Sequence, residues 1–146
     1  SSPGRPMGAR RRARELALQV LYESEFRALP VDSILQEICE HSRWSKTESN
    51  HALALLEGVG LHVQEIDDMI GGVLENWRLD RLHVMDRNVL RIGVYELRFC
   101  EDVPPKVAID EAIEVAKKFG STDSGRFVNG ILDRILTSGP PLCASS

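Results

Sequence analysis

The sequence predicts an all-α fold, and three observations support this class. Apolar residues recur at three- and four-residue spacing in one stretch after another, which is the pattern of amphipathic helices. Alternating Val- and Thr-rich runs are missing and aromatic residues make up only 5% of the 146 residues, which argues against a β-sandwich or barrel. Hydrophobic residues at 42% and charged residues at 27% are in the usual proportions for one globular domain with its own core.

The first part of the chain predicts two helices. The first covers about residues 9–28 and ends at Leu29-Pro30, because proline disrupts a helix. Asp32 is a suitable N-cap for the second helix, whose apolar side carries Ile34, Leu35 and Ile38. Residues 40–46 are polar and predict a loop.

The middle of the chain predicts one long helical segment and one buried helix. The long segment starts near Thr47 and continues to Leu74, with a kink or a close helix contact at Gly58 and Gly60. The next helix covers roughly residues 82–99 and is apolar on two stripes. A helix with two apolar stripes is normally buried at the centre of an all-α domain.

The last part of the chain predicts two further helices. Pro104-Pro105 stops one helix and starts the next, and Gly120 closes that helix in the C′ position. The final helix covers about residues 124–136. As domain boundaries we expect the flexible leader 1–8, in which residues 1–6 could be a cloning remnant, the helical domain 9–137 and the tail 138–146.

The sequence shows no arrangement of residues that supports catalysis. The histidines and cysteines have no metal-ligand spacing, and the neighbours Asp67 and Asp68 face different directions on a helix. No glycine-rich phosphate loop is present. We therefore expect no catalytic residue, no metal and no cofactor. No apolar stretch is long enough to span a membrane, and the scattered Cys39, Cys100 and Cys143 suit a reducing cytoplasm.

Positive charge is concentrated at the N-terminus. Residues 1–14 contain five arginines and no acid, a charge of +5, whereas the remainder carries a charge of −9. Cations at a helix N-terminus oppose the macrodipole and therefore lower the stability of the helix. This cost applies to Arg10, Arg11, Arg12 and Arg14, and binding of these arginines to RNA phosphates would explain it. The alternative is a solvated charged helix end.

Two aromatic residues are candidates for stacking on RNA bases. Tyr22 lies two turns beyond Arg14, and Phe127 lies beside Arg126 at the edge of the apolar stripe of the final helix. An exposed ring beside arginine can stack on a base. The alternative for both rings is packing in the core.

Three stretches together resemble the NusB family of bacterial antitermination factors: ARRRARELALQVLYESEF, DRNVLRIGVYEL and VPPKVAIDEAIEVAKKFGSTDSGRFVNGILDRI. The resemblance covers residues 8 to about 136. It implies an all-α fold of two small helical bundles packed into a single compact domain. It also implies binding of boxA, a short single-stranded RNA signal, in a heterodimer with the small-subunit ribosomal protein NusE. This heterodimer then acts in the RNA polymerase antitermination complex.

The resemblance also implies individual roles. Arg10, Arg11, Arg12 and Arg14 correspond to the family's RNA-contacting arginines and Tyr22 to their aromatic neighbour, while a second RNA-contacting stretch corresponds to Asp123, Arg126 and Phe127. Asp86 corresponds to an acidic position facing NusE. Two departures are notable: Gly125 replaces a larger polar residue, and residues 78–83 differ in length from some relatives.

Other interpretations remain open at this point. A NusB-like domain also forms the N-terminal part of some RNA cytosine methyltransferases, and this chain could be such a domain without its catalytic part. A purely structural helical oligomer is a third class. The free protein could be a monomer or a homodimer.

Overall fold

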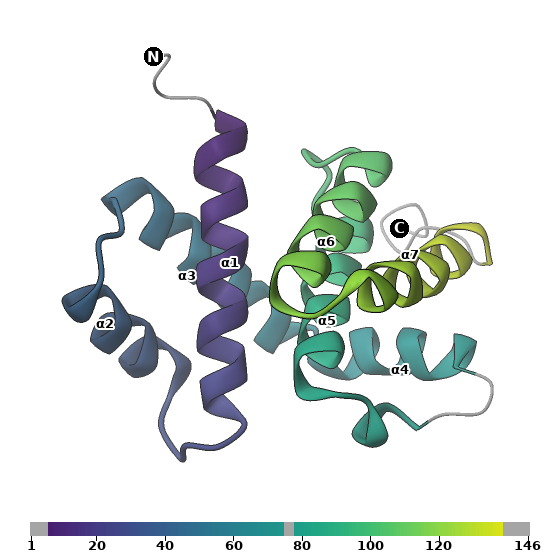
Figure 1. Cartoon of the computed structure of the whole chain (residues 1–146), viewed down its shortest axis with the longest axis horizontal. Coiled ribbons are helices and arrows are strands. Elements are labelled where there is room, and N and C mark those ends of the chain that lie inside the picture. The colour runs from purple at the N-terminus through teal and green to yellow at the C-terminus, as the bar shows by residue number, and fades with distance from the viewer. Residues whose placement is uncertain (1–5, 75–77, 139–146) are drawn as a thin grey trace. The chain divides into compact units, whose positions relative to one another are not determined.

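The computed structural model describes residues 6–74 and 78–138 (Figure 1). Within these ranges every regular element is helical, which confirms the all-α class: α1 Pro6–Ser24, α2 Val31–His41, α3 Lys46–Leu61, α4 Val63–Val73, the 3-10 helix η1 Leu79–Arg81, α5 Val84–Phe99, α6 Pro105–Phe119 and α7 Thr122–Thr137. The chain forms two compact units, residues 1–60 and 61–146, in agreement with the two expected bundles. None of the described helices is long and apolar enough to cross a membrane.

Helix α1 begins three residues before the predicted start and ends four residues before the predicted end. Its start at Pro6 makes residues 6–8 of the expected leader helical, while residues 1–5 and 139–146 lie outside the described residues. At the other end the Ser24 hydroxyl donates to the Leu21 carbonyl at 2.7 Å. The next two backbone amides bond to carbonyls three residues back, which tightens the final turn and ends the helix before Ala28.

Helix α2 starts at a backbone cap instead of the predicted side-chain cap. Its N-cap is Pro30, whose carbonyl accepts the amides of Ser33 and Ile34 at 3.1 and 3.2 Å. Asp32 lies in the first turn, where its negative charge interacts favourably with the helix dipole. Helix α2 packs against α1, and Ile34, Leu35 and Ile38 are buried as expected.

The predicted long segment is two helices, and the break lies at His62 instead of at Gly58 or Gly60. The backbone of His62 leaves the helical region with φ −111° and ψ 17°. Its ring stacks on Phe99 of α5 with centroids 4.1 Å apart, and its Nδ1 lies 2.9 Å from a carboxylate oxygen of Glu65. These contacts determine where α4 begins.

Helix α5 is the centre of the second unit, since α4, α6 and α7 all contact it. It starts at Val84, two residues after the predicted start, because the ring of His83 accepts the Met85 amide at 3.2 Å as an N-cap. Its buried apolar residues lie on both predicted stripes: Val89, Leu90, Ile92, Val94 and Leu97. A forked ion pair joins Arg91 to Asp67 of α4 at 2.9 and 3.0 Å.

The turn between α6 and α7 places the start of α7. The Gly120 amide donates to the Ala116 carbonyl at 2.8 Å, but its φ of −127° is not left-handed, contrary to the predicted C′ geometry. Glycine is required here for space, because a Cβ would lie 2.6 Å from the Ser124 hydroxyl. The Ser121 hydroxyl accepts the Ser124 amide at 3.2 Å, so α7 starts at Thr122, two residues before the predicted start.

Gly93 and Gly130 give a matched pair of substitutions. A Cβ on Gly93 would lie 2.9 Å from the buried Leu132 and 3.3 Å from Ala112, whereas a Cβ on Gly130 would have no atom within 4 Å. We expect Gly130→Ala to raise the free energy of unfolding by about 0.5–1 kcal/mol through helix propensity. Gly93→Ala should lower it by about 1–2 kcal/mol, since overpacking exceeds the same propensity gain. Urea denaturation measures both, and equal effects would contradict this account of the α5–α7 contact.

Candidate nucleic-acid interface

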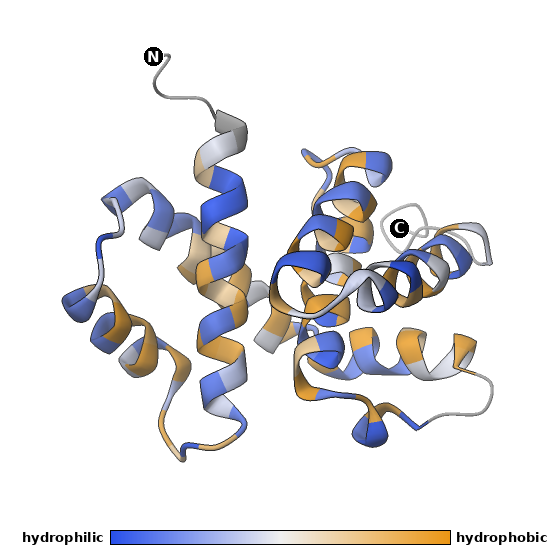
Figure 2. Cartoon of the chain, in the orientation of Figure 1, coloured by the Kyte–Doolittle hydropathy of each residue, from blue (hydrophilic) through white to orange (hydrophobic). Residues whose placement is uncertain are grey.

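The arginines of α1 have different environments. The helix has no acidic residue in its first turn, and its arginine-rich turns are strongly hydrophilic (Figure 2). Arg11 and Arg12 are exposed, Arg10 is half-buried and Arg14 is only 4% exposed. Successive residues point about 100° apart around a helix, so four arginines at these positions cannot share one face. The exposed cationic surface of α1 therefore consists of fewer arginines than the sequence suggests.

Arg12 makes several contacts with the segment between α2 and α3. Its Nε lies 3.0 Å from a carboxylate oxygen of Glu48, and one Nη donates to the Arg43 carbonyl at 3.0 Å. Its guanidinium carbon lies 4.4 Å from the centre of the Trp44 ring, within the range of a cation–π interaction. These contacts join α1 to a segment more than 30 residues away in sequence.

Glu48 also caps α3. Its second carboxylate oxygen accepts the Ser45 amide at 2.9 Å, while the Ser45 hydroxyl accepts the Glu48 amide at 3.0 Å. This reciprocal arrangement is a capping box, and its pattern, Ser-x-x-Glu, is visible in the sequence at residues 45–48. This pattern was not among the predicted features of the sequence, so the structural roles of Trp44 and Glu48 were not predicted.

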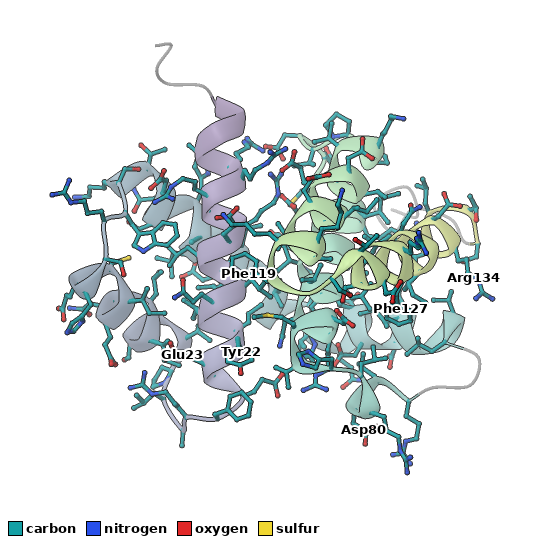
Figure 3. All side chains as sticks on the ribbon, viewed as in Figure 1. Tyr22, Glu23, Asp80, Phe119, Phe127 and Arg134 are labelled. Atoms are coloured by element: carbon teal, nitrogen blue, oxygen red, sulfur yellow. The ribbon has the colours of Figure 1, made fainter. Side chains whose placement is uncertain are left out.

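Tyr22 lies near the opposite end of α1 from the arginines (Figure 3). It is 36% exposed, and its nearest aromatic partner is Phe26, which is 65% exposed, with ring centroids 5.1 Å apart. Next to this pair Arg27 bridges Glu23 and Glu37 at 3.0 and 2.8 Å. Tyr22 is thus accessible to a planar ligand, while the charged groups of Glu23, Arg27 and Glu37 are already paired with one another.

The second group of predicted RNA-contacting residues lies at the start of α7. Asp123 and Arg126 form an exposed pair at 3.8 Å, with side chains 91% and 80% exposed, so both groups remain available to a ligand. Phe127 is half-buried (Figure 3). Gly125 is buried, and a Cβ there would lie 2.8 Å from the aliphatic stem of Lys117. A larger residue at position 125 would require that flexible stem to move.

Asp86 lies in the first turn of α5, half-buried, where the helix dipole favours a carboxylate. The segment before it, including η1, is held by Arg87, which donates to the Leu82 carbonyl at 3.1 Å and more weakly to that of Leu79. The departure in length at residues 78–83 therefore falls in a segment with defined contacts. The roles of Asp86 and of the two RNA-contacting groups remain predictions.

The described residues contain no group of His, Cys, Asp and Glu side chains that could hold a metal ion. Cys39 and Cys100 are not joined in a disulfide, and Cys143 lies outside the described residues. Burial raises the pKa of the Cys39 thiol and, as the largest cause, the pKa of Tyr95 to about 12. Neither group has the lowered pKa of an activated nucleophile.

Comparison with known sequences gives a consistent result. The family model described as the NusB family matches residues 11–137. A transcription antitermination protein NusB from Anaeromyxobacter sp. strain Fw109-5 is 49% identical, with 90% of this chain and 92% of that protein covered. The corresponding protein from Myxococcus xanthus is 45% identical, with 88% and 95% covered.

Solved structures show the same similarity. A crystal form of T. maritima NusB is 45% identical and superposes with a TM-score of 0.82, covering 90% of this chain and 93% of that chain. A structure of the antitermination factors NusB and NusE in complex with double-stranded RNA contains a chain that is 31% identical, with a TM-score of 0.82. That match covers 91% of this chain and 99% of the other.

The intermediate burial of Phe127 leads to a stability prediction. Truncating a fully buried phenylalanine costs about 3–5 kcal/mol, and a ring that is partly exposed should cost less. We expect Phe127→Ala to lower the free energy of unfolding by about 1–2 kcal/mol, measured by thermal and urea denaturation. Val128→Ala, at a fully buried neighbouring position, is the control for loss of core packing. A loss of 4 kcal/mol or more at Phe127 would identify the ring as part of the core.

Proposed function

The chain belongs to the NusB family of transcription antitermination proteins, and we propose that it binds boxA RNA together with NusE. In this proposal the heterodimer carries the RNA signal to RNA polymerase in the antitermination complex and suppresses termination in ribosomal RNA operons. The protein acts by binding and not by catalysis, and its place of action is the cytoplasm.

The observation that carries this proposal is the match, over 91% of this chain, to one chain of the structure of NusB and NusE with double-stranded RNA. The exposed cationic turns of α1 add chemical support, since arginine binds phosphate oxygens in a forked geometry. The RNA in the matched complex is double-stranded, whereas boxA is expected to be single-stranded, so an experiment must compare both forms.

The proposed RNA contacts divide into two kinds. Arg10, Arg11 and Arg126 bind phosphates, a contribution that depends on salt because bound RNA releases its counterions. Tyr22 and Phe127 stack on bases, a contribution that depends little on salt. The acidic remainder of the chain repels RNA, which restricts binding to these surfaces.

NusE is proposed to bind at the start of α5, where Asp86 supplies a negative charge. Once the two proteins are joined, contact of the RNA with the second protein becomes intramolecular. NusE should therefore raise the affinity for RNA. A homodimer of the free chain is the alternative assembly. Measurements of molecular mass in solution with and without NusE distinguish the homodimer from the heterodimer.

The methyltransferase alternative is less well supported. The relatives described above are named as transcription antitermination proteins, and the chain spans 92% and 95% of their length. If the protein were instead a structural oligomer without RNA affinity, it would retain no RNA at moderate salt.

Titration with boxA RNA over a range of salt concentrations tests the RNA contacts. Arg10→Ala/Arg11→Ala should reduce the slope of log Kd against log salt by about 1.4–1.8, the value for two lost phosphate contacts. Phe127→Ala should leave the slope unchanged and weaken binding by about 1–3 kcal/mol. Lys106→Ala, an exposed cation on α6, is the control. The same titrations with double-stranded RNA show which form is bound, and the absence of binding to either form would rule out the proposed function.

Charge reversal tests the proposed NusE surface. Asp86→Lys should weaken binding of NusE on the order of 1 kcal/mol, about fivefold, by reversing the charge at the interface. Calorimetry measures this affinity, and Asp110→Lys on the exposed side of α6 is the matched control. Equal affinities for wild type and Asp86→Lys would remove Asp86 from the interface.

A further inference from the structure

We propose that Arg12 is a positioning residue and that the segment it holds, through Arg43 and Lys46, extends the RNA-binding surface of α1. The ligand in this inference is the phosphate backbone of RNA. The inference rests on the proposed function, and it changes the role of one arginine and adds two cations from outside the family's arginine-rich stretch.

The contacts of Arg12 limit its use as a phosphate ligand. Its charge is compensated by Glu48 at 3.0 Å, and its guanidinium covers the face of Trp44 at 4.4 Å. A phosphate could bind Arg12 only by displacing the carboxylate or by removing the guanidinium from the ring. Arg11, one residue earlier, is exposed and points to another side of the helix.

The same contacts hold the segment between α2 and α3 at three successive residues. The Arg43 carbonyl accepts from Arg12, the Trp44 ring lies against the Arg12 guanidinium, and Ser45 forms the capping box with Glu48. A short connection held at each of these positions has little conformational freedom left to lose when it binds a ligand.

Arg43 is the first of the three held residues and Lys46 directly follows the last, and both residues are exposed. Among the described residues no ion pair involves the side chain of either cation. Because the Arg43 carbonyl is 3.0 Å from Arg12, this segment lies beside the arginine-rich turns of α1. The acid at the start of α3, Glu48, is already neutralised by Arg12, so it does not cancel the added positive charge.

Arg11 of α1 and Arg43 and Lys46 of the adjoining segment are exposed cations, and we call these three residues the two-element cationic surface. Cations from two elements can follow an RNA backbone over more phosphates than one helix face can. Phosphate contacts of this kind strengthen binding and orient the RNA without reading its sequence.

The first experiment measures the salt dependence of RNA binding by Arg43→Gln/Lys46→Gln with boxA RNA. We expect the slope of log Kd against log salt to fall by about 1.4–1.8, as for two lost phosphate contacts. Lys106→Gln is the matched control, because Lys106 is also an exposed lysine in the first turn of a helix. A wild-type slope for the double variant would overturn the inference.

The second experiment separates positioning from direct contact at Arg12. Arg12→Lys keeps the positive charge but loses the forked geometry that joins Glu48 and Arg43. In a Trp77→Phe background, which leaves Trp44 as the single tryptophan, we expect Arg12→Lys to shift the tryptophan emission to the red and to reduce the salt slope. Unchanged emission with an unchanged slope would contradict a positioning role.

Combining the substitutions completes the test. Arg12→Gln removes the charge, and if Arg12 acts through the held segment, this substitution should change the slope little further when Arg43 and Lys46 are already replaced. A further loss of about 0.7–0.9 in the combined variant would instead identify Arg12 as a phosphate contact. Circular dichroism and urea denaturation of each variant show whether it is folded, and only folded variants enter the comparison.

The outcomes also distinguish this inference from the function on which it rests. Wild-type protein that binds no RNA would overturn both. Wild-type protein whose slope depends on Arg10 and Arg11 but not on Arg43 and Lys46 would leave the proposed function standing and overturn the two-element cationic surface.

Discussion

One carboxylate group, that of Glu48, holds together two parts of the first unit: one oxygen accepts the Ser45 amide and the other lies against the Arg12 guanidinium. The start of α3, the preceding loop and an arginine of α1 are therefore set by the same side chain. Without this carboxylate, Arg12 would lose its counter-charge and Ser45 its cap, so both would be rearranged at once. The exposure of the remaining cations depends on this contact, because it places the loop beside the arginine-rich turns.

The second unit depends on a different constraint, the need to cover α5 on two sides. Helices α4, α6 and α7 supply that cover, and the absence of a side chain at Gly93 lets α7 approach closely. Since both α5 and α7 present functional candidates in their first turns, Asp86 and Asp123, the packing that buries the helix bodies also fixes the exposed ends.

Periodicity in the sequence was sufficient to predict the helices, because burial of an apolar stripe is a property of the whole segment. It was insufficient at the helix ends, because single hydrogen bonds determine the residue at which a helix begins or ends. Examples are the hydrogen bonds of the Ser24 hydroxyl, the Pro30 carbonyl and the Ser121 hydroxyl. For the candidate site, residue types and charge were readable from sequence, whereas exposure was not. The partner of Arg12 is 36 residues away, and no local pattern shows that Arg12 is paired or that Arg14 is buried.

The turn before α7 has a thermodynamic consequence for recognition. Gly120 allows close approach to Ser124, and Ser121 caps the helix, so the residues ahead of Asp123 and Phe127 are ordered by the fold itself. The conformational entropy of this segment is lost when the chain folds, and little remains to be lost when a ligand arrives. Contact at this end of α7 then resembles docking onto a rigid template more than coupled folding, and its heat-capacity change should reflect only the surface that the ligand covers.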